Sequence, residues 1–270
     1  MNTRVSSVDV EGARVVFHVD GTGPGLVLAH GTGGDAESNW SGVVAPLGVG
    51  RMVVRPNYSG SGQTTDDGGP LTVAGLAAQV VAASTAAGAV PFDLVGFSLG
   101  SAVATFIAAE YPHAVRSLVS LAGFVDTDAR QKLQFEIWRD LIDADRSAMA
   151  RLMLLSGLSS KHLNQLDPAS IQALTADVVA AVDWPGMRRQ IALDLTVDVR
   201  DQAQRIYVPT LVIGCEHDQM VPVAHARALA ALIPTARYAE MSCGHLALME
   251  NPDKFVDLVL DFLAAPGRHD

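Results

Sequence analysis

The feature of this sequence that most constrains its fold is a regular alternation between short apolar runs and longer amphipathic stretches. The apolar runs are rich in Val, Ile and Leu, which is typical of strands buried on both faces of a parallel sheet. They are RVVFHV at 14, GLVLAH at 25, RMVVRP at 51, FDLVGF at 92, SLVSLAG at 117, PTLVIG at 209 and ARYAEM at 236. The stretches that begin at Leu71, Ser98, Ala224 and Asn251 instead place apolar residues three and four apart, as amphipathic helices do. This alternation predicts an α/β fold with a mostly parallel central sheet and helices on both faces.

One long segment interrupts the alternation. Residues 125–205 contain several helical patterns and no convincing strand. We therefore predict a core formed by residues 1–124 and 206–270, and a helical cap formed by residues 125–205 that packs over the edge of the sheet. A chain of 270 residues can bury one large core, and its composition gives no sign of a second core of comparable size.

Charge and composition limit the partners. The chain has 29 acidic and 19 basic residues, and no cluster of Lys and Arg that could neutralise phosphates, so nucleic acid and anionic membranes are unfavourable partners. The sequence shows neither a secretory signal nor an apolar segment long enough to span a bilayer, so we expect a cytoplasmic protein. Cys215 and Cys243 are too few for a disulfide framework and are expected to be reduced, packed thiols. The oligomeric state is not legible in the sequence.

The segment Gly96-Phe97-Ser98-Leu99-Gly100 matches the pattern G-x-S-x-G, with a predicted strand before it and a predicted helix after it. Glycines on either side of Ser98 would allow a sharp turn and a close approach of strand and helix. The serine oxygen would then lie at the carboxyl end of the sheet, where ligands of α/β proteins bind. A competing interpretation is that Ser98 only caps the helix, a role that serine often fills.

A serine hydroxyl needs a base and a carboxylate to become a nucleophile, and the sequence offers both. His245 follows a glycine between the last predicted strand and the last predicted helix, and residues 216–218 (EHD) follow the strand at 209. All of them are expected at the same edge of the sheet as Ser98. Either Glu216 or Asp218 could supply the carboxylate, whereas the other nearby histidines, 217 and 225, lack the context of His245.

Several motifs in this order resemble those of the α/β-hydrolase family, in its capped serine-hydrolase branch, and the resemblance covers essentially the whole chain. They are HG at 30, GFSLG at 96, EHDQMVP at 216 and GHLALMENPDKFVDLVLDFL at 244. The resemblance implies a catalytic triad of Ser98 as nucleophile, His245 as base and Asp218, rather than Glu216, as orienting acid. It disfavours haloalkane dehalogenase and epoxide hydrolase activities, because those related enzymes use an aspartate where this chain has Ser98.

A tetrahedral intermediate also needs two amide donors for its negative oxygen. The amide of Leu99, directly after the nucleophile at the start of a helix, is the first expected donor, and the resemblance implies that Thr32 supplies the second. His30, just before this glycine-rich loop, is expected to brace it. The loop lacks the lysine of a phosphate-binding pattern, and the histidines and acids lack metal-ligand spacing, so we predict neither a cofactor nor a metal.

Substrate choice is expected to depend on the cap. Its apolar candidates are Phe124, Phe135, Trp138, Leu141, Met149, Met153, Leu154 and Leu155. Of these we predict that Phe124, Trp138 and Met153 contact substrate. The predicted function is hydrolysis of a carboxylic ester, thioester or lactone of a neutral or hydrophobic small molecule through an acyl-enzyme. The alternatives are a carbon–carbon bond hydrolase, a cofactor-free lyase or cyclase, and a ligand receptor with slow turnover.

Overall fold

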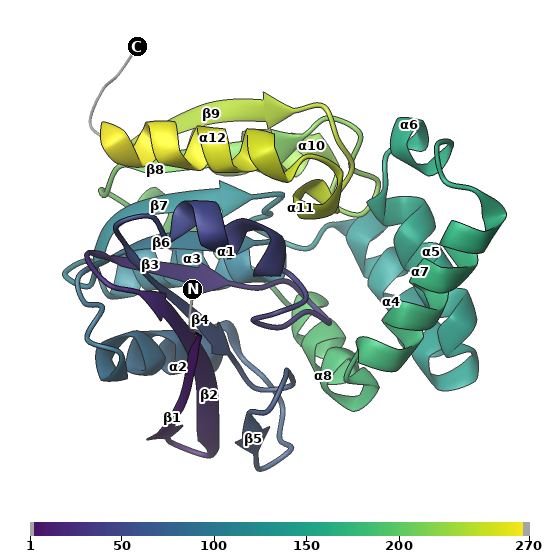
Figure 1. Cartoon of the computed structure of the whole chain (residues 1–270), viewed down its shortest axis with the longest axis horizontal. Coiled ribbons are helices and arrows are strands. Elements are labelled where there is room, and N and C mark those ends of the chain that lie inside the picture. Colours follow the sequence, from purple (N-terminus) through teal and green to yellow (C-terminus); the bar gives the residue numbers. More distant parts are fainter. Residues whose placement is uncertain (1–2, 267–270) are drawn as a thin grey trace.

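The computed structural model of the chain describes residues 3–266, so the ends of the predicted core at 1–2 and 267–270 lie outside the description. Within the described residues, nine strands form one sheet in the order β1-β2-β4-β3-β6-β7-β8-β9, with β5 paired to β2 (Figure 1). They are β1 (Arg4–Val10), β2 (Ala13–Gly21), β3 (Gly25–Ala29), β4 (Met52–Asn57), β5 (Thr65–Asp66), β6 (Phe92–Phe97), β7 (Val115–Leu121), β8 (Thr210–Cys215) and β9 (Ala236–Met241). The pairings of β2 with β1, β4 and β5 are antiparallel, and every pairing from β4 through β9 is parallel.

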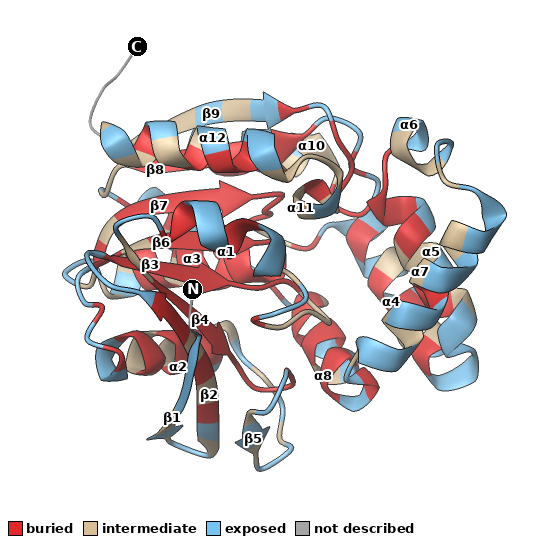
Figure 2. Ribbon diagram, in the orientation of Figure 1, coloured by how far each residue is buried: buried red, intermediate tan, exposed pale blue. Residues whose placement is uncertain are grey.

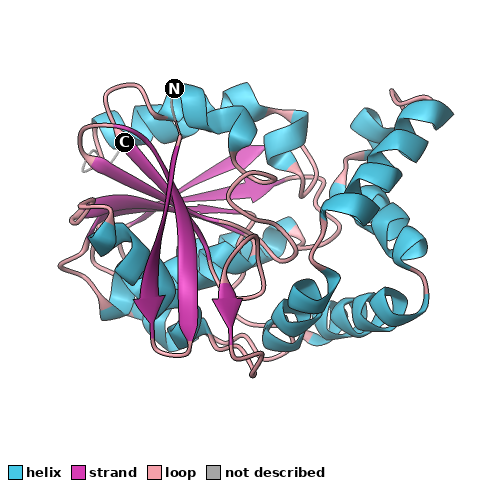
Figure 3. Ribbon diagram, turned by 60° about the horizontal axis from the view of Figure 1, so that its bottom comes forward, coloured by secondary structure: helices cyan, strands magenta, loops and turns pink. Residues whose placement is uncertain are grey.

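Helices cover both faces of the sheet (Figure 3). One face carries α1 (Ser41–Leu47), α11 (Ala247–Glu250) and α12 (Pro252–Ala264), and the other carries α2 (Val73–Ala86), α3 (Leu99–Glu110), α9 (Arg200–Gln204) and α10 (Val223–Leu232). Each face has its own cluster of buried apolar side chains. The central strands β3, β6 and β8 are buried almost throughout (Figure 2), which explains why their sequences are continuous apolar runs.

Five further helices stand beside the carboxyl ends of the strands, and we call them the cap (Figure 1). They are α4 (Ala129–Ala144), α5 (Arg146–Gly157), α6 (Ser160–Leu163), α7 (Pro168–Ala181) and α8 (Trp184–Asp194). Each begins after an aspartate or serine whose side chain accepts a hydrogen bond from the amide three residues later: Asp128, Asp145, Ser159, Asp167 and Asp183. These capping side chains satisfy amides that have no partner within the helix, and so fix where each cap helix starts.

The structure confirms the predicted α/β fold with a mostly parallel sheet and all seven predicted strands. It adds β1 and the two-residue strand β5, which the sequence analysis did not predict. The short helix α9 packs against α3 and α10 of the core rather than within the cap. The division at 125–205 therefore stays a prediction. None of the helices in residues 3–266 has the length and apolar character required to cross a bilayer.

Candidate active site

Ser98 occupies the turn between β6 and α3 with a strained backbone, at φ 54° and ψ −121°. A positive φ is costly for a residue with a side chain, and such strain persists only where the surrounding structure imposes it. The Ser98 side chain makes no capping hydrogen bond to α3. The interpretation of Ser98 as a simple helix cap is therefore wrong.

Two glycines make this turn possible because backbone atoms pass too close to them for any side chain. A Cβ at Gly96 would lie 2.3 Å from the carbonyl oxygen of Gly100, and a Cβ at Gly100 would lie 2.1 Å from the carbonyl oxygen of Ala29. Both distances are far below van der Waals contact. The glycines of G-x-S-x-G thus allow α3 to pack directly on β6 and β3, and this packing holds Ser98 at the edge of the sheet.

The structure brings Ser98, His245 and Asp218 into one hydrogen-bonded chain. His245 Nε2 lies 3.0 Å from Ser98 Oγ, and His245 Nδ1 lies 2.6 Å from Asp218 Oδ2. With Nδ1 protonated, the imidazole donates to the carboxylate and accepts from the serine hydroxyl. The second oxygen, Asp218 Oδ1, accepts hydrogen bonds of 2.8 Å from the amides of Met220 and Val221. This arrangement can remove the proton from a serine hydroxyl as it attacks a carbonyl carbon.

The loop that carries the histidine is held by neighbouring segments. Glu250 Oε1 accepts from the amides of Gly244, 3.0 Å away, and of Ser159 in the cap, 2.6 Å away. The amide of Leu246, directly after the histidine, donates to the carbonyl of Gly157, also in the cap.

The competing carboxylate Glu216 points elsewhere: its side chain is 53% exposed and lies beside His217.

The glycine-rich loop after β3 is fixed residue by residue. The Gly31 amide donates to Asn39 Oδ1 at 2.8 Å, the Gly33 amide donates to Gln190 Oε1 at 2.8 Å, and the Gly34 amide donates to the Gly31 carbonyl at 3.1 Å. Of the four amides from 31 to 34, only that of Thr32 has no acceptor among the described residues. The Leu99 amide likewise has none within this part of the chain. An amide without an internal partner is free to bind an oxyanion.

His30 lies beneath this loop and contacts it. Its Nδ1 is 2.9 Å from the Gly31 carbonyl oxygen, and its ring stacks on Tyr58 with centroids 3.8 Å apart. Burial lowers the pKa of His30 to about 4, so the imidazole is neutral at physiological pH. These contacts are those of a residue that braces the loop.

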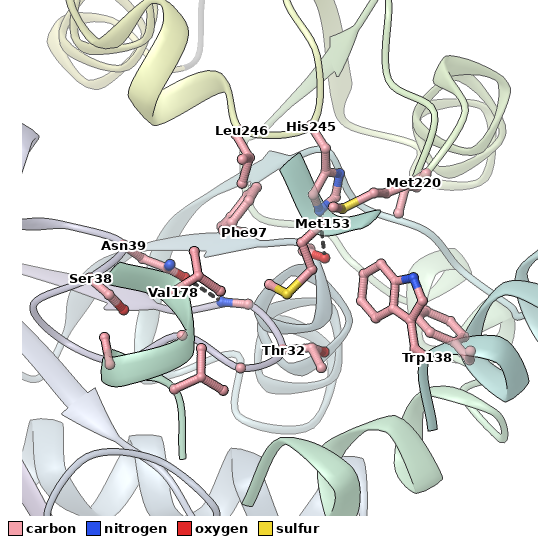
Figure 4. A pocket seen from close by; sticks show the side chains of 18 of the residues that line it. Thr32, Ser38, Asn39, Phe97, Trp138, Met153, Val178, Met220, His245 and Leu246 are labelled. Carbon is pink, nitrogen blue, oxygen red and sulfur yellow. Dashed lines mark hydrogen bonds between the residues drawn. The ribbon is translucent and has the colours of Figure 1, made fainter. Parts of the chain in front are cut away.

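A cavity of about 280 Å³ is lined by Ser98 and His245 and by residues of both the core and the cap (Figure 4). Thr32 lines it from the core, and Trp138 and Met153, the two cap residues expected to contact substrate, line it from the cap. Phe135, another of the apolar cap candidates, also lines the cavity. The sequence analysis missed other apolar lining residues: Phe97, Val178, Ala181, Val182, Met220, Val221 and Leu246. Phe97, Met220 and Leu246 could have been found, because each lies within two residues of a predicted triad member in the sequence.

The prediction that Phe124 contacts substrate is wrong, because Phe124 does not line the cavity. It lies just after β7, is 1% exposed, and packs into the apolar cluster that covers the α3 side of the sheet and continues into the cap. A large apolar side chain gains most free energy where water is fully excluded, and the core provides that environment directly beside the strand.

Within residues 3–266, no group of three or more His, Cys, Asp or Glu side chains could hold a metal ion. Cys215 and Cys243 are both buried and free. The hydrogen bond with Cys243 and, after it, burial raise the pKa of the Cys215 thiol, so it is not a reactive thiolate at neutral pH.

Comparison with known proteins supplies the family. A family model described as the alpha/beta hydrolase fold matches residues 24–252. The chain is 51% identical to the pyrrolizixenacetamide deacetylase of Xenorhabdus hominickii, over 96% of this chain and 98% of the relative. It is 28% identical to a putative carbamate hydrolase of Azorhizobium caulinodans, over 93% of this chain and 95% of that protein.

Solved structures agree with this result. A hydrolase from Pseudomonas aeruginosa superposes with a TM-score of 0.85 at 26% identity, and the match covers 97% of this chain and 98% of that one. The enol-lactonase of Burkholderia xenovorans superposes with a TM-score of 0.86 at 24% identity, over 96% of this chain and 100% of that one, and it shows the fold alone. The chain belongs to the α/β-hydrolase family.

Proposed function

We propose that this chain is a serine hydrolase that cleaves the acyl bond of a small, mainly apolar molecule through an acyl-enzyme on Ser98. The observation that carries the proposal is the hydrogen-bonded chain from Asp218 through His245 to Ser98, placed at the base of a cavity. In this proposal Ser98 is the nucleophile, His245 is the general base and Asp218 holds the imidazole in the useful tautomer.

The reaction proceeds in two halves. His245 Nε2 takes the hydroxyl proton while Ser98 Oγ attacks the acyl carbon, and the carbonyl oxygen becomes an oxyanion that binds the amides of Leu99 and Thr32. His245 then passes its proton to the departing alcohol or amine, which leaves Ser98 acylated. In the second half a water molecule gives a proton to His245 and attacks the acyl carbon. Collapse of the second tetrahedral intermediate releases the acid and returns the proton to Ser98.

The cavity favours a neutral substrate. Most of its lining side chains are apolar, and Trp138 and Met153 face it from the cap (Figure 4). Apart from His245, the described residues that line it include one ionisable side chain, the carboxylate of Asp177. Asp177 is exposed and water screens its charge, so the apolar walls carry the preference, because burying a carboxylate or phosphate group against them without a partner is costly. We therefore propose esters or amides without an anionic group as substrates, and thioesters and lactones as further candidates.

Similarity favours acetyl as the acyl group and an amide among the bonds that are cleaved. The relative that is 51% identical over nearly the whole of both chains is a deacetylase of pyrrolizixenacetamide. An amide is harder to cleave than an ester because its nitrogen leaves only when protonated, a step that His245 would perform. We thus propose deacetylation of an N-acetyl or O-acetyl compound as the second, more specific candidate function.

The test uses p-nitrophenyl esters from acetate to decanoate, together with p-nitroacetanilide as the matched acetyl amide. Wild type is compared with Ser98→Ala and with the control Ser84→Ala, which removes a buried hydroxyl whose one partner among the described residues is the Val80 carbonyl on α2. We expect turnover that depends on Ser98, with acetate preferred among the esters and measurable cleavage of the anilide.

The other outcomes separate the alternatives. Ester cleavage with an optimum at long chains and none of the anilide would retain the hydrolase and contradict deacetylation. Activity that survives in Ser98→Ala would contradict the nucleophile. A folded wild type that turns over none of these compounds would contradict acyl hydrolysis and favour a carbon–carbon bond hydrolase, a lyase or a ligand receptor.

A further inference from the structure

The carboxyl group of Asp194 is buried in a place where nothing neutralises it. Asp194 is the last residue of the cap helix α8 and has no exposed surface. Its Oδ2 accepts a hydrogen bond of 2.7 Å from Thr32 Oγ1, and its Oδ1 has no partner among the described residues. Burial raises the pKa of Asp194 to about 7. A buried acid without a cation is costly to keep, so a structural explanation for its presence is needed.

Gln190 lies one helical turn before Asp194 on the same face of α8, and its side-chain amide is fully used. Its Oε1 accepts from the Gly33 amide at 2.8 Å, while its Nε2 donates to the Gly60 carbonyl at 3.1 Å and to Ser61 Oγ at 2.7 Å. Gln190 is completely buried. One side chain of the cap therefore joins two separate loops of the core.

Together these contacts leave the backbone amide of Thr32 free to donate a hydrogen bond. Residues 31, 32 and 33 are each held by a different side chain, namely those of Asn39, Asp194 and Gln190. Thr32 is held through its hydroxyl, so its amide stays available while the flanking amides of Gly31 and Gly33 are occupied. Such an arrangement fixes the direction of the Thr32 N–H bond without consuming it.

We propose that Asp194 and Gln190 are positioning residues through which the cap helix α8 sets the Thr32 amide as the second oxyanion donor. The inference rests on the proposed function, since an oxyanion forms only if Ser98 attacks an acyl group. It assigns to the cap a part in the chemical step in addition to its part in the substrate pocket. Removing the Thr32–Asp194 hydrogen bond is expected to weaken binding of the transition state more than binding of the substrate.

The test is a double-mutant cycle with Thr32→Val, which keeps the amide and the shape but removes the hydroxyl, and Asp194→Ala. With p-nitrophenyl acetate, each single variant should lose about 10-fold in kcat while KM changes less than about 2-fold. The double variant should be no worse than the poorer single variant, because both changes remove the same bond. Asp194→Asn keeps an acceptor oxygen for the Thr32 hydroxyl and should stay within about 3-fold of wild type.

A second measurement does not depend on turnover. Phenylboronic acid forms a tetrahedral adduct with an activated serine and places an oxygen where the oxyanion would lie. Its dissociation constant should rise about 10-fold in Thr32→Val and in Asp194→Ala. The control is Asp143→Asn. It breaks the exposed ion pair between Asp143 on α4 and Arg188 on α8, whose shortest N–O distance is 3.0 Å, and should leave kcat and boronate binding unchanged. Thermal unfolding of every variant checks that it folds.

The outcomes keep the two proposals apart. Additive losses in the double variant, or unchanged kcat and boronate binding in Thr32→Val, would overturn the positioning role while the Ser98-dependent activity stands. A wild type that lacks turnover but binds the boronate through Ser98 and loses it in Thr32→Val would overturn the proposed function and support the positioning role. If Asp194→Ala fails to fold, Thr32→Val and Asp194→Asn still test the positioning role.

Discussion

At the scale of single residues, two neighbouring carboxylates have different surroundings. Asp218 is 7% exposed and bonded to His245, whereas Glu216 is largely in solvent. Asp218→Asn would place an amide beside His245 and favour the wrong tautomer, so kcat for p-nitrophenyl acetate should fall about 10³- to 10⁴-fold. Glu216→Gln is the matched control and should remain within about 2-fold of wild type. The reverse result would move the orienting acid to Glu216.

The buried carboxyl group of Asp194 leads to a second prediction at this scale, on how the free energy of unfolding depends on pH. Burial raises its pKa from the ordinary 3.8 to about 7, and the hydrogen bond from Thr32 acts in the opposite direction. Between about pH 4 and pH 7 the unfolded chain releases the proton while the folded chain keeps it, so this carboxyl destabilises the folded state progressively as pH rises. Asp194→Asn removes that penalty. Its free energy of unfolding, relative to wild type, should rise by up to about 4 kcal/mol from pH 4 to pH 8.

Urea unfolding of both proteins at pH 4, 6 and 8 measures this difference. Tyr58, which is affected by the charge of Asp194, stays uncharged across this range, because burial raises its pKa well above the usual value. A difference that does not change with pH would show that Asp194 is ionised in the folded protein throughout.

At the scale of elements, the contact of α3 with β3 permits no side chain at Gly100. A methyl group there would lie 2.1 Å from the carbonyl oxygen of Ala29, and neither backbone can yield without separating helix from sheet. Gly100→Ala should therefore lower the free energy of unfolding by at least about 2 kcal/mol and reduce kcat. Gly42→Ala is the control, because a Cβ there meets nothing within 4 Å on helix α1, and alanine should be neutral or stabilising by about 0.5–1 kcal/mol. Equal stability of the two variants in urea would contradict this account.

Glu250 of α11 connects elements of the cap and the core. Its carboxylate accepts from the Gly244 amide and from both the amide and the hydroxyl of Ser159. Glu250→Gln replaces one acceptor with a donor, so the loop before His245 should loosen, with about 1–2 kcal/mol less stability and about 10-fold lower kcat. The measurements are urea unfolding and p-nitrophenyl acetate kinetics, with the exposed Glu136→Gln as control. Unchanged kcat would limit the role of Glu250 to stability.

At the scale of the whole molecule, the features that could be predicted from the sequence are those set by apolar runs and by local motifs. The seven predicted strands and the turn at Ser98 were legible because each is set by a few consecutive residues. The strand β1 was missed because its sequence, RVSSVDV, is polar and mostly exposed at the sheet edge. The short helix α1 was missed because it has only seven residues and contains Pro46. Local patterns are weak where an element is short or solvent-exposed.

The contacts between distant segments were not predictable. Thr32 and Asp194 are 162 residues apart in sequence, and neither local composition nor spacing points from one to the other. The same applies to Phe124, whose apolar side chain fits a pocket or a core equally well until the packing around β7 is known. Patterns in the sequence give the faces of elements, and only the assembled fold gives their neighbours.

The double attachment of the cap has a consequence for how such proteins can be altered. Helix α8 holds the loop at Thr32, and the segment from Gly157 to Ser159 holds the loop at His245. Exchanging the cap for that of another protein in order to change the substrate would also remove the supports of both loops. A successful chimaera would have to transfer Thr32 and Glu250 with the cap as matched partners, since the border between specificity and chemistry does not follow the border between cap and core.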